Sequence, residues 1–264
     1  VSVGADGVIF AGPVGSGDGV DIVARFFEPD GSEVELCGNG VGSFCYWVID
    51  RGFVTPGKRE IRVLTSAGVV RGKKLGDNGE VRVCIPTPRD MKQGLELEAR
   101  GRHWSADYLL TGVPHLVTWV DDLGDLDVFG YGRALRRHEA FAPRGVNVNF
   151  VQVLDQGRIA VRTFEFGVED ETLACGTGSS SAAILTALRK QWNSDFRTGQ
   201  KPVEVNVQSG DTLRVWFEMD DQGDPVDVCL DTLVRPVYKG TLDGRLARQA
   251  LTDRQPCPAT TSNQ

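Results

Sequence analysis

Two copies of one short motif, about half the chain apart, constrain how this sequence can fold more than any other feature. The pattern C-G-x-G-x-x-S begins at Cys37 and again at Cys175, and a helix-favouring stretch follows each copy. A repeat at this spacing is typical of two similar structural halves. We therefore predict helices over 41–51 and 179–191, each starting after its cysteine turn, with a boundary between the halves near 108–118.

Most of the remaining sequence predicts β-strands. Apolar and polar residues alternate in six segments separated by turn residues, namely 80–86, 115–120, 146–154, 158–166, 203–210 and 212–219. This alternation is typical of strands that bury one face. We therefore predict an α+β fold in which mostly antiparallel strands wrap around two central helices. Our predicted domains are an N-terminal lobe over 1–112, a C-terminal lobe over 113–244 and a polar tail over 245–264.

Composition narrows the class of protein. The net charge of −7 argues against a nucleic-acid surface, and no segment reaches the roughly 18 apolar residues of a membrane span. Six cysteines are scattered over the chain, which is unlike the dense disulfide framework of a small secreted domain. We therefore expect a cytoplasmic protein with neither a nucleic-acid nor a membrane partner. Three further cysteines in apolar segments are expected to be buried structural residues: Cys45, Cys84 and Cys229.

The position of the motif cysteines suggests acid/base chemistry. A thiol in the first turn of a helix faces the positive end of the helix dipole, which lowers its pKa. Glycines beside it let the backbone amides approach and hold a carboxylate. Two such thiols on opposite faces of one carbon could remove a proton from one side and deliver one to the other. The alternatives are two inert buried cysteines, or a disulfide between the halves.

At these residues the sequence resembles the diaminopimelate epimerases. The segments "VGADGVIF", "DGSEVELCGNG", "GVPHLV", "GVNVNF" and "FEFGVEDETLACGTG" occur in the family's order, and the resemblance spans roughly residues 3 to 240. It implies two barrel-like lobes, each wrapping a central helix with the active site between them. It further implies a homodimer that epimerises a small-molecule amino-acid substrate without pyridoxal phosphate, metal or any other cofactor.

The resemblance also implies roles for individual residues. Cys37 and Cys175 match the two catalytic cysteines, and His115 and Glu165 match the residues that assist the thiols. The turn residues expected to hold the reacting carboxylate and amine are Gly38, Asn39, Gly176 and Thr177. Asn147 matches a substrate-binding asparagine. From the residues alone, His115 could equally be a packing residue and Glu165 a solvent-facing strand carboxylate.

Three positions depart from the family where it grips the distal end of diaminopimelate. Glu28 and Val113 stand where the family has asparagines, and Phe166 stands where it has an arginine. These changes remove hydrogen-bond donors for the distal carboxylate and add a like charge, at about 1.5–3 kcal/mol for each lost pair. The family's N-terminal G-x-G-N-D-F motif is not found in this sequence. Either the chain is cut before Val1 or the N-terminal lobe is built differently, and we expect this lobe to lack its first strand or to obtain it otherwise.

We therefore predict an amino-acid racemase or epimerase whose substrate is not diaminopimelate. Apolar walls from Val113 and Phe166, with Glu28 as an acceptor, favour a basic or aromatic nitrogen-containing side chain. Three alternatives stay open: a true diaminopimelate epimerase, a non-catalytic amino-acid-binding protein, and another cofactor-free isomerase of the same fold.

Overall fold

The computed structural model describes Ala5 and residues 7–13, 19–28, 30–34, 38–54 and 57–241. Residues Val1–Val234 form one compact unit, and Arg235–Gln264 form a second. Cys37 and the predicted tail over 245–264 lie outside the described residues. The predicted lobe boundary at 112/113 stays a prediction.

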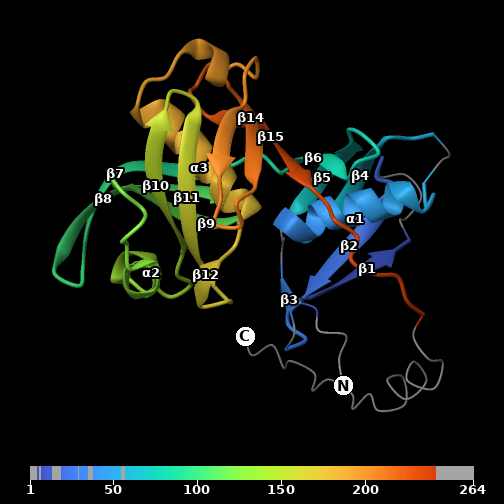
Figure 1. Ribbon diagram of the computed structural model, residues 1–264, viewed down its shortest axis with the longest axis horizontal. Helices are drawn as coiled ribbons and strands as arrows, with labels where there is room; N and C mark the ends of the chain where they lie inside the picture. Colours follow the sequence, from blue (N-terminus) through green and yellow to red (C-terminus); the bar gives the residue numbers. More distant parts are fainter. Residues whose placement is uncertain are drawn as a thin grey trace, which may run out of the picture. The chain divides into compact units, whose positions relative to one another are not determined.

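The first unit is built on one long, mostly antiparallel sheet (Figure 1). Its order is β1-β2-β4-β5-β6-β15-β14-β13-β11-β10-β9-β8-β7, with β3 beside β2 and β12 beside β11. Among the described residues, only β2–β4, β9–β10 and β11–β13 pair in parallel. The strands are β1 (Val8–Gly12), β2 (Ile22–Phe27), β3 (Glu33–Val34), β4 (Glu60–Thr65), β5 (Gly68–Lys74), β6 (Glu80–Cys84), β7 (Arg89–Ala99), β8 (Arg102–Thr111), β9 (Val113–Trp119), β10 (Asn147–Asp155), β11 (Arg158–Glu165), β12 (Asp170–Thr172), β13 (Val203–Asn206), β14 (Thr212–Met219) and β15 (Pro225–Leu233).

One helix packs against each of the two halves of this sheet, as the repeated motif predicts. α1 (Gly38–Asp50) packs against β4, β5 and β6, whereas α3 (Gly176–Arg189) contacts strands from β8 to β15 (Figure 1). The first twelve residues of α3, through Ala187, are all buried, so strands surround this helix. Small side chains permit that close approach, and the Ser180 and Ser181 hydroxyls donate to backbone carbonyls one turn earlier. The predicted α+β fold, with strands wrapped around central helices, is confirmed.

A third helix, α2 (Val128–Arg136), covers β10 and β11 and was not predicted. Asp127 caps it by accepting a hydrogen bond from the Gly130 amide at 2.8 Å. Its Gly132 lies against Phe164, where an added Cβ would come within 2.4 Å of the Phe164 Cβ. Glycine therefore permits the close contact between helix and sheet, although it weakens the helical signal in the sequence.

The C-terminal strand joins the two halves of the sheet. β15 pairs with β14 on one side and with β6 on the other, so residues 225–233 lie beside residues 80–84. Cys84 and Cys229 face each other in this pairing and form a disulfide. The expectation of burial is therefore wrong for these two cysteines, because they are half-buried and joined to each other. It is confirmed for Cys45, which is fully buried in α1.

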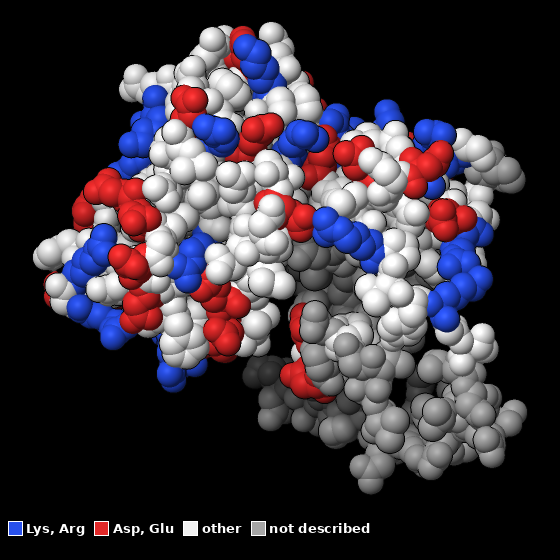
Figure 2. Space-filling view, viewed as in Figure 1, with Lys and Arg blue, Asp and Glu red and all other residues white. Residues whose placement is uncertain are grey.

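The surface of the described residues carries both signs of charge. Figure 2 shows acidic and basic side chains interspersed over the face in view, without one large patch of either sign. Many charged residues of the described part of the chain form ion pairs, such as Arg25 with Glu33 and Lys58 with Asp21. Among the described residues, no helix combines the length and the apolar character needed to span a lipid bilayer.

Candidate active site

Cys175 occupies the capping position at the start of α3. Its backbone is extended, with φ −119° and ψ 111°, and its carbonyl accepts the first helical hydrogen bond, from the Ser179 amide at 2.8 Å. Its Sγ accepts a hydrogen bond from the Gly178 amide at 3.4 Å. The sulfur therefore takes the place of the usual capping oxygen, at the positive end of a long helix, where a thiolate is stabilised.

Gly178 explains why this turn is glycine-rich. A Cβ at this position would lie 2.3 Å from the Asn149 Oδ1 and 3.2 Å from the Cys175 Sγ. Any side chain here would therefore displace the asparagine and crowd the sulfur. The helix consequently starts at Gly176, three residues before the predicted start, because the cysteine side chain caps it and the glycines form its first turn.

Glu165 lies at the end of β11, and a hydrogen-bonding interaction with the Cys175 thiol lowers the pKa of its carboxyl group. Its Oε1 also accepts a hydrogen bond from the Thr172 Oγ1 at 2.5 Å, across the β11–β12 pair. Burial raises the pKa of Glu165, and the negative charge of Glu28 raises it further, against the lowering effect of the two hydrogen bonds. The carboxyl group is thus placed to exchange a proton with the Cys175 sulfur.

His115 approaches Cys175 through one intervening hydroxyl. The ring lies on β9 with no solvent exposure, and burial lowers the pKa of His115 to about 3, so the imidazole is neutral. Its Nε2 lies 2.9 Å from the Thr177 Oγ1, which in turn lies 3.6 Å from the Cys175 Sγ. The structure therefore brings four predicted site residues together: Cys175, Glu165, His115 and Thr177.

The predicted substrate-binding residue Asn147 holds the backbone near this cluster. Its Nδ2 donates to the Pro114 carbonyl at 3.1 Å, and its Oδ1 accepts from the Phe166 amide at 2.8 Å. These bonds tie the residue before His115 to the residue after Glu165. The Phe166 side chain is 39% exposed, and the Arg136 guanidinium lies over its ring at 4.6 Å.

The two other predicted distal residues come from different halves of the chain. Val113 is half-buried at the start of β9, two residues before His115. Glu28 follows β2 and is half-buried at a turn closed by hydrogen bonds to Gly31 and Ser32. Because the charge of Glu28 acts on Glu165, the first half of the chain contributes a carboxylate to the surroundings of Cys175.

The N-terminal copy of the motif is described only in part. Gly38 and Asn39 are the first residues of α1, which matches the placement of Gly176 and Thr177 in α3. Cys37 and the side chain of Asn39 lie outside the described residues. A pairing of two thiols around one carbon therefore stays a prediction.

Sequence reasoning missed Asn149, which contacts His115 directly. Its Nδ2 lies 3.2 Å from the His115 Nδ1 and donates to the Leu116 carbonyl at 2.9 Å. The signal was present, because residues two apart on a strand share a face, and Asn149 follows Asn147 by two. Arg162 was also missed: it binds both carboxylate oxygens of Glu171 at 2.7 Å and so holds β12 against β11 beside Glu165.

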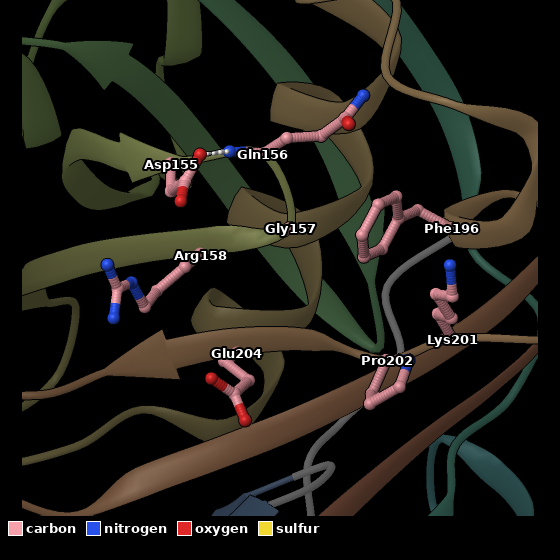
Figure 3. Close-up of a pocket in the computed structure, with 8 residues that line it drawn as sticks. All are labelled: Asp155, Gln156, Gly157, Arg158, Phe196, Lys201, Pro202 and Glu204. Atoms are coloured by element: carbon pink, nitrogen blue, oxygen red, sulfur yellow. Dashed lines mark hydrogen bonds between the residues drawn. The ribbon is translucent and has the colours of Figure 1, made fainter.

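A cavity of about 380 Å³ lies away from these residues, near the β10–β11 turn (Figure 3). Its walls carry charges of both signs, and the Phe196 ring faces Gly157, where an added Cβ would come within 2.2 Å of that ring. The lining residues are Asp155, Gln156, Gly157, Arg158, Phe196, Lys201, Pro202 and Glu204. Among the described residues, neither Cys175 nor its hydrogen-bond partners Thr177 and Gly178 line this cavity.

Comparison with known proteins agrees with the fold and with the motif. Residues 108–231 match the family model described as diaminopimelate epimerase. The chain is 37% identical over 240 residues to the diaminopimelate epimerase of Aquifex aeolicus, covering 91% of this chain and 81% of that protein. It is 33% identical over 244 residues to that of Chlorobaculum tepidum, covering 91% of this chain and 86% of that protein.

Solved structures share the fold at lower identity. A probable proline racemase from Agrobacterium radiobacter K84 aligns with a TM-score of 0.68 and 16% identity, covering 90% of this chain and 76% of that one. A hydroxyproline epimerase from Agrobacterium vitis aligns with a TM-score of 0.64 and 17% identity, covering 86% of this chain and 71% of that one. With the curated relatives above, the conclusion is that the chain is an isomerase and belongs to the diaminopimelate epimerase family.

Proposed function

We propose that this protein inverts the α-carbon of an amino acid other than diaminopimelate, by proton transfer between two cysteines. In one direction the Cys175 thiolate takes the α-proton from one face of the carbon, and the Cys37 thiol delivers a proton to the other face. Glu165 takes up the thiol proton that Cys175 must lose beforehand. The observation that carries the proposal is the capping thiol of Cys175, which acts on a half-buried carboxyl group, Glu165, whose pKa burial raises.

The substrate class follows from the residues around this pair. Glu28 places a negative charge close enough to raise the pKa of Glu165, so a distal carboxylate on the substrate would meet repulsion there. Phe166 offers an exposed ring, with Arg136 over it, where the family pattern has an arginine. A cationic or N–H-bearing side chain, such as an imidazole or another basic group, is complementary to the Glu28 carboxylate.

Diaminopimelate is the competing substrate, because the two curated relatives reported above carry the name diaminopimelate epimerase. Glu28 and Phe166 are the two residues at which this chain can be changed to test one substrate against the other. Restoring the family residues with Glu28→Asn and Phe166→Arg would remove a repulsive charge and add a donor for a distal carboxylate. Each change is worth about 1.5–3 kcal/mol, or about 10- to 150-fold in kcat/KM for diaminopimelate relative to the favoured substrate.

The test is a panel of amino acids, including diaminopimelate and basic and aromatic ones, incubated with the enzyme in D₂O. NMR follows loss of the α-proton signal, and Cys175→Ala is the matched inactive control. We expect exchange with at least one basic or nitrogen-containing amino acid and faster diaminopimelate exchange in the double variant. Efficient exchange of diaminopimelate by the wild type would refute the substrate class, and no exchange with any member of the panel would refute the isomerase activity on these substrates.

A further inference from the structure

The side-chain amide of Asn149 has only one orientation that satisfies its neighbours. One end lies 2.9 Å from the Leu116 carbonyl, which can only accept, so that end must be the NH₂ group. The other end then presents its oxygen to the Thr163 hydroxyl at 3.0 Å, which can donate. Asn149 is fully buried, so water does not compete for these positions.

This orientation decides which nitrogen of His115 carries the proton. The second hydrogen of the Asn149 NH₂ group points to the His115 Nδ1 at 3.2 Å, so Nδ1 must accept. A neutral imidazole carries one proton, which then resides on Nε2. The Nε2–H group therefore donates to the Thr177 Oγ1, 2.9 Å away.

The consequence reaches the sulfur. A threonine hydroxyl that accepts a hydrogen bond from His115 keeps its own hydrogen for another acceptor. The Cys175 Sγ lies 3.6 Å away from that hydroxyl oxygen. We propose that Asn149 is a positioning residue: it fixes the His115 tautomer and thereby turns the Thr177 hydroxyl hydrogen towards the Cys175 sulfur, which favours the thiolate.

Other described groups also act on this sulfur, with effects of both signs. The Glu165 carboxyl group interacts with the Cys175 thiol, and the charge of Glu28 acts on Glu165. These carboxyl groups oppose a thiolate when ionised, whereas the Gly178 amide and the Thr177 hydroxyl donate to it. The relay through Asn149 therefore adds a second uncharged donor to the Gly178 amide, and it leaves His115 as an orienting donor rather than a base.

The first experiment reads the tautomer directly in the substrate-free protein. Nitrogen-15 NMR of histidine-labelled protein distinguishes a protonated from an unprotonated ring nitrogen, and a His115→Gln variant assigns the His115 signals. We expect Nε2–H in the wild type and Nδ1–H in Asn149→Asp, because a carboxylate at this place accepts from Nδ1. An Nδ1–H tautomer in the wild type would overturn the proposal.

The second experiment measures how fast iodoacetamide alkylates Cys175 as a function of pH, with mass spectrometry of the Cys175 peptide. Loss of a hydrogen bond to a thiolate should raise the thiol pKa by about one unit and slow alkylation about tenfold at pH values below it. We expect this in Thr177→Val and Asn149→Asp, with wild-type behaviour in Thr177→Ser, which keeps the hydroxyl. Thr118→Val is the matched control, because this buried hydroxyl on β9 donates to the Ser105 carbonyl instead.

Equal alkylation profiles in wild type and Thr177→Val would overturn the proposal, even if Asn149→Asp fails to fold. The consequence for turnover rests on the proposed function, but neither readout needs a substrate. If no amino acid exchanges its α-proton while the tautomer and the alkylation shift are found, the proposed function fails and this inference stands.

Discussion

Breaking the Cys84–Cys229 disulfide should destabilise the protein by an amount that the loop length sets. The bond joins residues 145 positions apart, and loop-closure entropy for a ring of that length gives about 5 kcal/mol at 25 °C. Residual structure in the reduced, unfolded chain lowers this, so we expect a loss of 2–5 kcal/mol, as is typical for native disulfides. Both cysteines line a hollow of about 220 Å³ on the protein, which gives a reductant access to the bond.

Urea unfolding followed by fluorescence, with and without a phosphine reductant, measures this difference. The Cys84→Ser/Cys229→Ser double variant should match the reduced wild type and should no longer respond to reductant. The slope of the free energy of unfolding against urea should increase on reduction, because the uncrosslinked unfolded chain exposes more surface. Identical midpoints for oxidised and reduced protein would refute the reasoning.

Three further outcomes are expected. Gly178→Ala should lower the free energy of unfolding in urea by about 1–3 kcal/mol, because the alanine Cβ would lie 2.3 Å from the Asn149 Oδ1. Unchanged stability would contradict that packing. Burial raises the pKa of Glu165, so its stabilising contribution is complete below about pH 4 and is lost as the pH rises through the folded-state pKa. The free energy of unfolding of Glu165→Gln should therefore rise relative to that of the wild type between about pH 4 and 8, and a constant difference would argue against this. Burial raises the pKa of Cys45 to about 12, which leaves a thiolate fraction of about 10⁻⁴ at pH 8, so iodoacetamide should label Cys45 only after unfolding, as peptide mapping would show.

The repeated motif allowed the core of the fold to be predicted, because it marks both the helix starts and the two halves. The helices begin at Gly38 and Gly176 rather than at residues 41 and 179. Glycine has a low helix propensity, which hides a first turn that the capping side chain of Cys175 supports. α2 was missed for a related reason, since its Gly132 is explained only by the contact with Phe164.

Strand pairing between residues far apart in the chain could not be predicted from local sequence patterns. The register that brings Cys84 opposite Cys229 depends on β15 crossing to β6, which no local pattern records. The same limit applies to the relay at the site. His115 and Thr177 were both singled out, but their hydrogen bond and its link to Asn149 depend on the packing of α3 against β9 and β10. The predicted homodimer stays a prediction.

The pairing of β15 with β6 also sets the order in which the strands of the sheet can pair while the chain is being synthesised. The strands over residues 8–84 emerge early, but the outer edge of β6 has no neighbour until β15 is made, about 145 residues later. At about 5–20 residues per second, that edge waits roughly 7–30 s during synthesis. An unpaired strand edge is a template for pairing with other nascent chains, so the early half requires protection throughout that interval.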